Sequence, residues 1–413
     1  MHYKDLKLSK GLINALIEQG ITEQTEIQEK SFSLISSGKS LVGIAQTGTG
    51  KSLAYLVPIL KILSYSNQKH PRVLIIVPTR ELVVQVTEQL EKLTKYLSIR
   101  TLGIYGGANI NIQKQLIHDG IDILVSTPGR LYDIALTGIL RLLSVKHLVI
   151  DEFDEMLSLG FKTQLQNILE LLPTKRQNLL FSATNIDDVS ALIKAHFQPI
   201  VEIQVSQANK ALETIDYMFY SVPNFNTKLN FLKHLFEDNT YQKVLIFAKS
   251  KKFADLIFNH LNYYFENQFG VLHSNKSQNL RLRMLHEFEQ NVIRGIISTD
   301  VMARGIDVQS ISHVINFDLP EDTEQFIHRT GRTGRNKEKG ITLSFVNHED
   351  ELKLDSINSY LNHSYEIQQL PQEIEISNEL IREEEPVNIH DAPTLNQKYK
   401  KVSSNHIRTK KSK

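Results

Sequence analysis

Two adjacent carboxylates, Asp151 and Glu152, are the residues of this chain best suited to chemistry. They directly follow the apolar run 147–150, which has the length of a buried strand. Acids at the end of a strand can hold a metal ion with one carboxylate and polarise a water molecule with the next. Such a pair more often caps a helix or lies in a solvated turn, so its meaning depends on the rest of the chain.

A glycine-rich loop upstream follows the apolar run 41–45 and precedes the helical pattern 53–63. Its residues are Ala45, Gln46, Thr47, Gly48, Thr49, Gly50, Lys51 and Ser52. The glycines let backbone N–H groups turn toward phosphate oxygens, and the following helix directs its positive end there. In this pattern Lys51 reaches the β- and γ-phosphates and Ser52 binds Mg²⁺. A glycine-rich turn without a ligand is the alternative, which the strand–loop–helix context disfavours.

The loop gives the two acids a function. We expect Asp151 to hold Mg²⁺ through water, and Glu152 to position or deprotonate the attacking water. Phosphoryl transfer needs mainly a metal ion, orientation and neutralisation of charge. The residues alone therefore predict hydrolysis of ATP or GTP.

A segment far downstream, residues 328–335, contains His328 and three arginines, Arg329, Arg332 and Arg335. Basic clusters usually lie on a solvated surface or bind phosphates. If Arg332 and Arg335 reach the γ-phosphate from a second domain, hydrolysis requires the domains to close. An arginine supplied in this way is worth roughly 10³–10⁵ in kcat.

The elements that must position these residues alternate between strand and helix. Apolar runs occur at 41–45, 73–77, 123–125, 148–150 and 179–181, and again at 244–247, 270–272, 296–298, 313–317 and 341–346. This alternation predicts two α/β domains, each a parallel sheet flanked by helices. We expect the domains at 1–205 and 216–365, joined by a linker at 206–215. Residues 366–413 are expected to form a disordered tail, acidic at first and basic at its end.

The composition of the 413 residues excludes several classes of protein. A net charge of +1 means that any surface for nucleic acid is local. The absence of cysteine excludes disulfides and thiolate metal sites. The first residues lack a signal-peptide core, and no apolar run has the roughly 20 residues of a membrane helix. We therefore expect a cytoplasmic protein that does not enter a membrane.

Further segments with distinctive sequences accompany the loop, the acids and the arginines. They lie at 20–28, 78–82, 106–107, 127–130, 182–184, 247–250, 278–281, 298–300 and 303–307. In order and spacing, this set resembles the DEAD-box RNA helicase family of helicase superfamily 2, over about residues 1–360. The resemblance implies two tandem RecA-like domains, ATP and Mg²⁺ as cofactors, and RNA as the partner.

The resemblance also implies roles for individual residues. Tyr3 would stack on adenine and Gln28 would read its edge, which favours ATP over GTP, and Asp307 would contact the nucleotide. Asp154, Ser182, Ala183 and Thr184 would couple hydrolysis to unwinding. His328 would join the catalytic arginines. The residues implied to contact RNA are Pro78, Thr79, Arg80, Gly106, Gly107, Thr127, Pro128, Gly129, Arg130, Arg281 and Thr299. Backbone, hydroxyl and guanidinium groups of this kind hold phosphates and sugars and do not read bases.

Two positions depart from the family pattern. Gln24 stands where a proline is usual, and we expect a looser loop there. Phe153 stands where the family has alanine, and overpacking is expected to cost about 1–3 kcal/mol unless neighbouring side chains shrink. It would also change the contact with residues 182–184.

Three functions are consistent with the sequence. The first is an ATP-dependent RNA helicase or remodeller of RNA–protein complexes. The second is an ATP-dependent RNA clamp with weak unwinding, suggested by Phe153. The third is a DNA translocase, which shares the two-domain plan. Ribosomal or RNA-decay proteins are candidate protein partners, and the oligomeric state stays open.

Overall fold

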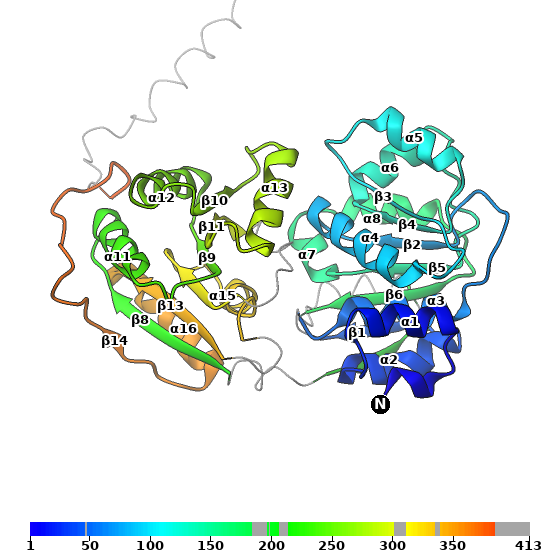
Figure 1. Ribbon diagram of the computed structural model, residues 1–413, viewed down its shortest axis with the longest axis horizontal. Coiled ribbons are helices and arrows are strands. Elements are labelled where there is room, and N and C mark those ends of the chain that lie inside the picture. Colours follow the sequence, from blue (N-terminus) through cyan, green and yellow to red (C-terminus); the bar gives the residue numbers. More distant parts are fainter. Residues whose placement is uncertain are drawn as a thin grey trace, which may run out of the picture.

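Two parallel sheets of seven strands each organise the chain, as the computed structural model in Figure 1 shows. The structure describes residues 1–45, 48–183, 196–197, 199–205, 214–300, 311–334 and 339–384. The first sheet lies in the N-terminal domain and the second in the C-terminal domain.

The first sheet has the order β3-β4-β2-β5-β6-β1-β7, and all of its neighbouring strands are parallel. Its strands are β1 (Leu41–Ile44), β2 (Val73–Ile76), β3 (Thr101–Ile104), β4 (Ile123–Ser126), β5 (His147–Ile150), β6 (Gln177–Ser182) and β7 (Val201–Gln204). The described helices of this domain are η1 (Tyr3–Leu6), α1 (Lys10–Glu18), α2 (Glu26–Ser36), α3 (Lys51–Ile62), α4 (Arg80–Thr94), α5 (Ile110–His118), α6 (Pro128–Leu136), α7 (Phe153–Ser158) and α8 (Lys162–Glu170).

Successive residues of a strand point to opposite faces of a sheet, and both faces are covered here. In β2, Val73 and Ile75 join the apolar core beneath α1–α4, whereas Leu74 and Ile76 join the core on the other face. Strands buried on both faces have continuous apolar sequences. This is why short unbroken runs predicted most of the strands correctly.

The second sheet has the order β10-β11-β9-β12-β13-β8-β14 and is also parallel. Its strands are β8 (Ile215–Ser221), β9 (Val244–Phe247), β10 (Phe269–Leu272), β11 (Gly295–Ser298), β12 (His313–Asn316), β13 (Gly340–Val346) and β14 (Ile367–Gln368). The described helices here are α11 (Phe225–Glu237), α12 (Lys251–Tyr264), α13 (Gln278–Glu289), α15 (Thr323–Thr330), η2 (His348–Asp350) and α16 (Glu351–Leu361). Figure 1 shows α13 at the border with the first domain, where α4 and α7 face it.

Four strands of the described chain, β3, β7, β8 and β14, have no counterpart among the predicted runs. β7 and β14 are mostly exposed. β3 is half-buried, and β8 alternates between buried and exposed residues, so neither has a continuous apolar sequence. β8 begins at Ile215, inside the predicted linker, while residues 206–213 lie outside the described residues.

The segment 366–384 differs from the expected disordered tail. β14 pairs with β8, and Ile374 is buried in the core between α11 and the sheet. Three asparagines near the start of α11, Asn224, Asn226 and Asn230, donate side-chain hydrogen bonds to carbonyls of this segment at 2.7–2.9 Å. The acidic composition suggested disorder, but these contacts are made with residues about 150 positions away. Residues 385–413 lie outside the described chain.

Among the residues described, none of the helices combines the length and the apolar character needed to span a bilayer.

Candidate ATP site and RNA interface

The phosphate loop lies at the carboxyl end of β1, and α3 begins at Lys51. Gly48 and Gly50 have φ values of 83° and 88°, a left-handed conformation that favours glycine. A Cβ on Gly50 would also collide with the side-chain amide of Gln28. The first N–H groups of an α-helix have no partner within the helix, so those at the start of α3 are suited to bind phosphate. Gln46 and Thr47 lie outside the described residues.

The two acids predicted to act on the nucleotide meet this loop. Lys51 Nζ lies 3.1 Å from Glu152 Oε1, and the Lys51 side chain is only 5 % exposed. Asp151 is buried and accepts a hydrogen bond from the Tyr55 hydroxyl at 2.9 Å. Tyr55, on α3, also shares a hydrogen bond with Ser52, so it joins the two predicted Mg²⁺ ligands. Sequence reasoning missed Tyr55 because it occupies an apolar core position of the helix.

Charge is unbalanced in this cluster. Burial raises the pKa of Asp151 to about 6, the charge of Glu152 adds to the rise, and Lys51 opposes it. Burial alone would lower the pKa of Lys51, but the charges of Glu152, Asp151 and Asp154 outweigh it and raise that pKa. Among the described residues, the charges of these three carboxylates all act on the ammonium group of Lys51. Such a surplus of oxygen ligands and negative charge fits Mg²⁺, which prefers carboxylate and hydroxyl oxygens.

The backbone turns sharply at Glu152, whose φ of 50° is left-handed and costs about 1–2 kcal/mol for a residue with a Cβ. This turn ends β5 and starts α7. It keeps Glu152 at the phosphate loop and sends the next residue, Phe153, into the core. Backbone strain of this kind is concentrated at functional sites.

Phe153 does not lie in the nucleotide site. It is fully buried on the β-sheet face away from α3, and its ring meets Phe197 edge-on with centroids 6.4 Å apart. The next residue, Asp154, accepts the N–H of Ala183 at 3.0 Å. The connection between the acidic motif and residues 182–184 is thus made despite Phe153. Thr184 lies outside the described residues, and the effect of Phe153 on activity stays a prediction.

Tyr3 and Gln28, the two residues predicted to contact adenine, are connected to the phosphate loop by hydrogen bonds. Gln28 Nε2 donates to the Gly50 carbonyl at 3.0 Å, and Gln28 Oε1 accepts the Tyr3 hydroxyl at 2.8 Å. Thr25 caps α2 together with Gln28. Tyr3 is buried, which raises its pKa. The structure therefore joins Tyr3, Gln28 and the loop into one unit.

Gln24, which stands where the family usually has proline, makes a backbone hydrogen bond. Its backbone N–H, a donor that proline lacks, bonds to the Met1 carbonyl at 3.0 Å. An isolated antiparallel β-bridge between His2 and Glu23 joins the same two segments of the chain. The effect of Gln24 on the flexibility of this loop stays a prediction.

Three predicted RNA loops converge at the carboxyl ends of β2, β3 and β4. Pro78 and Thr79 lead into α4, where Thr79 caps the helix, and Arg80 packs against Gly106 and Gly107. Thr127 is the N-cap residue of α6, but its side chain makes no capping hydrogen bond, and Pro128 is the first residue of the helix. The guanidinium of Arg130 donates to the Ala108 carbonyl at 3.1 and 3.2 Å and to Gln113 at 2.8 Å. Gly129 has open space where a side chain would lie.

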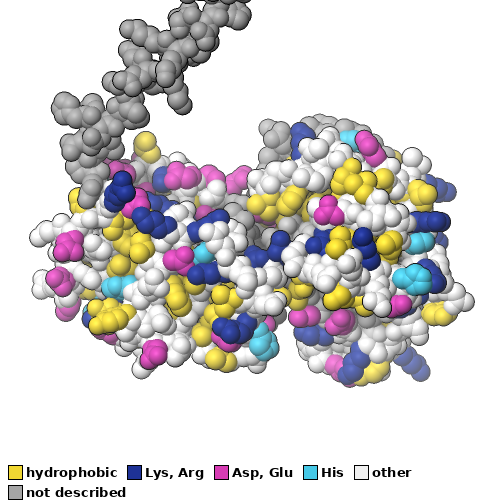
Figure 2. All heavy atoms as spheres, turned by 90° about the horizontal axis from the view of Figure 1, so that it is seen from above, with side chains coloured by type: hydrophobic (Ala, Val, Ile, Leu, Met, Phe, Trp, Pro, Cys, Tyr) yellow, Lys and Arg dark blue, Asp and Glu magenta, His cyan; other side chains and the backbone are white. Residues whose placement is uncertain are grey.

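The helix α4, which follows the first of these loops, also contacts α13 of the second domain. The buried Glu81 carboxylate lies 3.3 Å from Arg281 Nη1 and accepts Gln278 Nε2 at 3.3 Å. Arg281 thus bridges α13 to α4 in this arrangement. Figure 2 shows Lys and Arg side chains gathered along the border of the domains on this face. Arg281 was predicted from the sequence to contact RNA, whereas no role was predicted for Glu81.

In the second domain, Arg329 and Arg332 have different hydrogen-bond partners. Arg329 is buried and paired with Asp300, with Nε–Oδ1 and Nη2–Oδ2 distances of 2.5 and 2.8 Å. Arg332 is also buried, and its Nε donates to the His328 carbonyl at 3.3 Å. Thr299 follows β11 and is half-buried. Arg335 and Asp307 lie outside the described residues.

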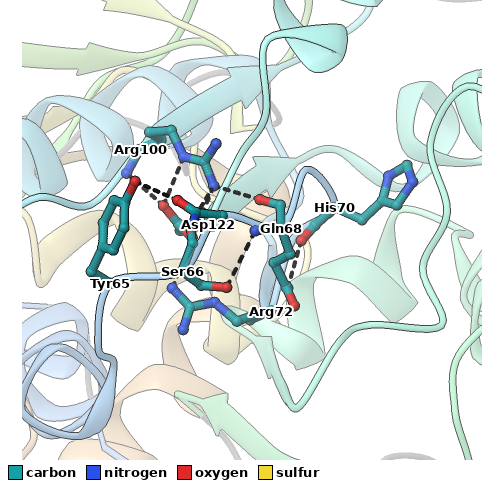
Figure 3. A network of polar contacts seen from close by, with 8 residues as sticks. Tyr65, Ser66, Gln68, His70, Arg72, Arg100 and Asp122 are labelled. Atoms are coloured by element: carbon teal, nitrogen blue, oxygen red, sulfur yellow. Dashed lines mark hydrogen bonds and ion pairs between the residues drawn. The ribbon is translucent and has the colours of Figure 1, made fainter.

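A second buried carboxylate, Asp122, lies at the amino ends of the strands of the first sheet. We call this side the amino edge, and the side of Asp151 and the phosphate loop the carboxyl edge. Asp122 accepts hydrogen bonds from Arg72 at 2.7 Å and from the side chain and backbone N–H of Arg100 at 3.0 Å (Figure 3). Arg100 also donates to the carbonyls of Ser66 and Gln68. Burial alone would raise the pKa of Asp122, but the bonds from Arg100 and Arg72 outweigh it and lower the pKa.

The chain matches two family models in order. A DEAD/DEAH box helicase model covers residues 25–192, and a helicase conserved C-terminal domain model covers residues 227–337. The ATP-dependent RNA helicase RhlB of Shewanella oneidensis is 34% identical over 88% of this chain and 84% of its own length. The corresponding protein of Shewanella amazonensis is 33% identical over 95% of this chain and 89% of its own length.

Solved structures agree with this relationship. Dbp5 of S. cerevisiae, bound to RNA and ADP BeF3, has a TM-score of 0.80 and 26% identity over 90% of this chain and 96% of that one. Mss116p, bound to ssRNA and AMP-PNP, has a TM-score of 0.78 and 26% identity over 89% of this chain and 78% of that one. The two parallel sheets are tandem RecA-like domains, and the chain belongs to the DEAD/DEAH box helicase family.

Proposed function

We propose that this ATP-dependent RNA helicase hydrolyses ATP at the carboxyl edge of its first sheet and uses the reaction to grip and release RNA. The observation that carries the proposal is the buried cluster of Lys51, Asp151 and Glu152, which has more negative than positive charge. A purely structural cluster would be neutralised. This one is completed by a cation and a phosphate.

Each member of the cluster has a role in phosphoryl transfer. Lys51 would exchange its 3.1 Å contact with Glu152 for the phosphates, which frees that carboxylate to orient the attacking water and take its proton. Ser52 and Asp151 would hold Mg²⁺, which neutralises charge when bound. Arg332 and Arg335, with His328 beside them, would add positive charge when the domains close.

The RNA would be held by backbone contacts in both domains. In support, the loops at 78–80, 106–108 and 127–130 are tied together, and Glu81 with Arg281 connects them to α13. The resemblance to Dbp5 and Mss116p spans both domains, and both of those proteins are bound to RNA. Contacts to phosphate and sugar imply binding without base specificity.

The alternative of a clamp with weak unwinding rests on Phe153, whose effect on activity stays a prediction. Phe153 points into the core, and Asp154 still bonds to Ala183 at 3.0 Å. A DNA translocase has no observation of its own in its favour.

The test is RNA-stimulated ATP hydrolysis by the full chain, with single-stranded RNA, duplex RNA and DNA of the same sequence. We expect strong stimulation by RNA and little by DNA. Lys51→Ala should abolish hydrolysis under all conditions and controls for contaminating ATPases. An ATPase rate unchanged by RNA would sink the proposal, and equal stimulation by DNA would favour the translocase.

A further inference from the structure

Lys228, on α11, is a buried charged residue that belongs to none of the motifs named above. Its Nζ lies 3.1 Å from Asp318 Oδ1, and the two side chains are only 6% and 10% exposed. The ammonium group also lies 5.4 Å from the centroid of the Phe317 ring. Lysines are rarely buried unless they are paired, so Asp318 explains why this one lies inside the domain.

Asp318 has a second partner in a predicted RNA-contact segment. Its Oδ2 accepts the backbone N–H of Lys249 at 3.1 Å. Lys249 lies between β9 and α12, in residues 247–250. The carboxylate therefore joins α11 to the loop that leads into α12.

The backbone of Asp318 reaches two more motifs. Its carbonyl accepts Arg329 Nη1 at 2.7 Å, and Arg329 in turn pairs with Asp300. The Arg329 guanidinium also lies 4.9 Å from the ring centroid of Phe247. One residue thus connects segments 247–250, 298–300 and 328–335, and Lys228 neutralises its charge.

We propose that Lys228 is a positioning residue for RNA binding, which acts through Asp318 on the loop 247–250. A buried carboxylate is stable only with a counter-charge and hydrogen bonds. Without the ammonium group, Asp318 turns toward water and releases the Lys249 N–H, and the loop loses its fixed position. The inference rests on the proposed function, since it needs this loop to contact RNA.

The test compares Lys228→Met with wild type in RNA-stimulated ATPase assays, using oligo(U) RNA and the full chain. We expect the RNA concentration for half-maximal stimulation to rise about tenfold, in line with the loss of one charged hydrogen-bonding group. The KM for ATP should stay within about twofold. Lys228→Arg keeps the charge and should restore RNA affinity to within about threefold of wild type.

Two control variants separate positioning from general destabilisation. Lys233→Met removes a half-buried lysine of the same helix, which contacts Glu237 and Tyr264, and should leave RNA affinity unchanged. Arg294→Met removes a cation that contacts Phe236, Phe265 and Phe269 at the amino end of β11. It should lower the melting temperature of the C-terminal domain and leave RNA affinity unchanged.

The outcomes are distinguishable. Wild type without RNA stimulation would overturn the proposed function, and this inference with it. A stimulated wild type with unchanged RNA affinity in Lys228→Met, or equal weakening in Arg294→Met, would overturn the inference alone. If Lys228→Met does not fold, Lys228→Met/Asp318→Asn carries the test, because it leaves no unpaired charge. A neutral amide accepts the Lys249 N–H more weakly, so RNA affinity should fall about threefold, and no change would count against positioning.

Discussion

The two edges of the first sheet each bury an aspartate beside cationic side chains, yet the two carboxylates have opposite properties. Asp122, at the amino edge, has two arginines and a backbone N–H, and its pKa is lowered. Asp151, at the carboxyl edge, shares Lys51 with Glu152, and its pKa is raised to about 6. Asp122 is neutralised within the fold. Asp151 lacks sufficient positive charge, which a ligand can supply.

This difference distinguishes a structural ion cluster from a functional one. Burial of a charge is costly unless partners compensate it. The amino edge meets this condition with residues of the chain alone. The described residues of the carboxyl edge leave it unmet, and we expect Mg²⁺ to supply the missing positive charge. Sites with strongly shifted pKa values in a loop at a strand end are candidates for function for this reason.

The largest effect is expected from Glu152→Gln. The amide can still accept a hydrogen bond from Lys51, so ATP should bind normally, but it cannot take a proton from water. The RNA-stimulated kcat should fall about 10²–10⁴-fold, as measured in steady-state assays beside a nucleotide-binding titration. The variant should unfold no more easily than wild type, because it removes one of three crowded carboxylates. A large loss of stability would mean that this edge is structural, like the other.

Asp122→Ala should have the converse effect. Removing the carboxylate leaves Arg72 buried without its counter-charge, which should cost about 3–5 kcal/mol of unfolding free energy. Urea denaturation followed by circular dichroism measures this loss. The kcat of the folded fraction should stay within about twofold of wild type. A specific fall in kcat would show that the amino edge communicates with the nucleotide site.

The pH dependence of stability should differ in sign between the two edges. The folded-state pKa of Asp151, about 6, lies above its usual value, so its stabilising contribution is complete at low pH and is lost as pH rises through 6. The free energy of unfolding of Asp151→Asn should therefore rise relative to that of wild type as pH rises from about 4 to 7, by at most about 3 kcal/mol. Asp122 has a lowered pKa, so wild type should exceed Asp122→Asn most at neutral pH and lose this advantage as pH falls.

Denaturation midpoints over this pH range, with EDTA and without nucleotide, would measure both differences. If the midpoints of the two variants changed with pH in the same direction relative to wild type, the contrast between the edges would be contradicted.

The sequence predicted the carboxyl edge much better than the amino edge. Gly48, Gly50 and Lys51 form a local pattern whose chemistry depends on neighbours in the chain, and Asp151 directly follows its strand. The amino-edge cluster unites residues from three separate connections, 65–72, 100 and 122, and each alone resembles ordinary loop polarity. Contacts between distant segments depend on the register of the sheet, which the sequence does not display.

The same reason explains what else was missed. Segment 366–384 has an acidic sequence typical of disorder, and it is ordered by contacts with Asn224, Asn226 and Asn230. The core position of Phe153 was also not predicted, because the sequence does not reveal that the backbone turns at Glu152. Lys228 and Asp318 are separated by 90 positions. In each case the decisive contact lies outside the local pattern.

The smallest effect is expected from Tyr55→Phe, which tests how the fold limits the charge imbalance at the carboxyl edge. The Tyr55 hydroxyl donates to Asp151 at 2.9 Å, and this bond opposes the rise in pKa that burial causes. Its loss should cost about 0.5–1.5 kcal/mol of stability and raise the pKa of Asp151 further. The acid limb of kcat/KM for ATP should move to higher pH, since that profile reports the free enzyme.

Tyr65→Phe is the matched control, because the exposed Tyr65 hydroxyl bonds to Asn67 at the amino edge. It should leave the pH profile where it is in wild type. If Tyr55→Phe also leaves the profile in place, the ionisation of Asp151 is set by Lys51 and Glu152 without help from the helix. The difference between the pKa shifts of Asp151 and Asp122 would then depend only on the number of cationic side chains beside each carboxylate.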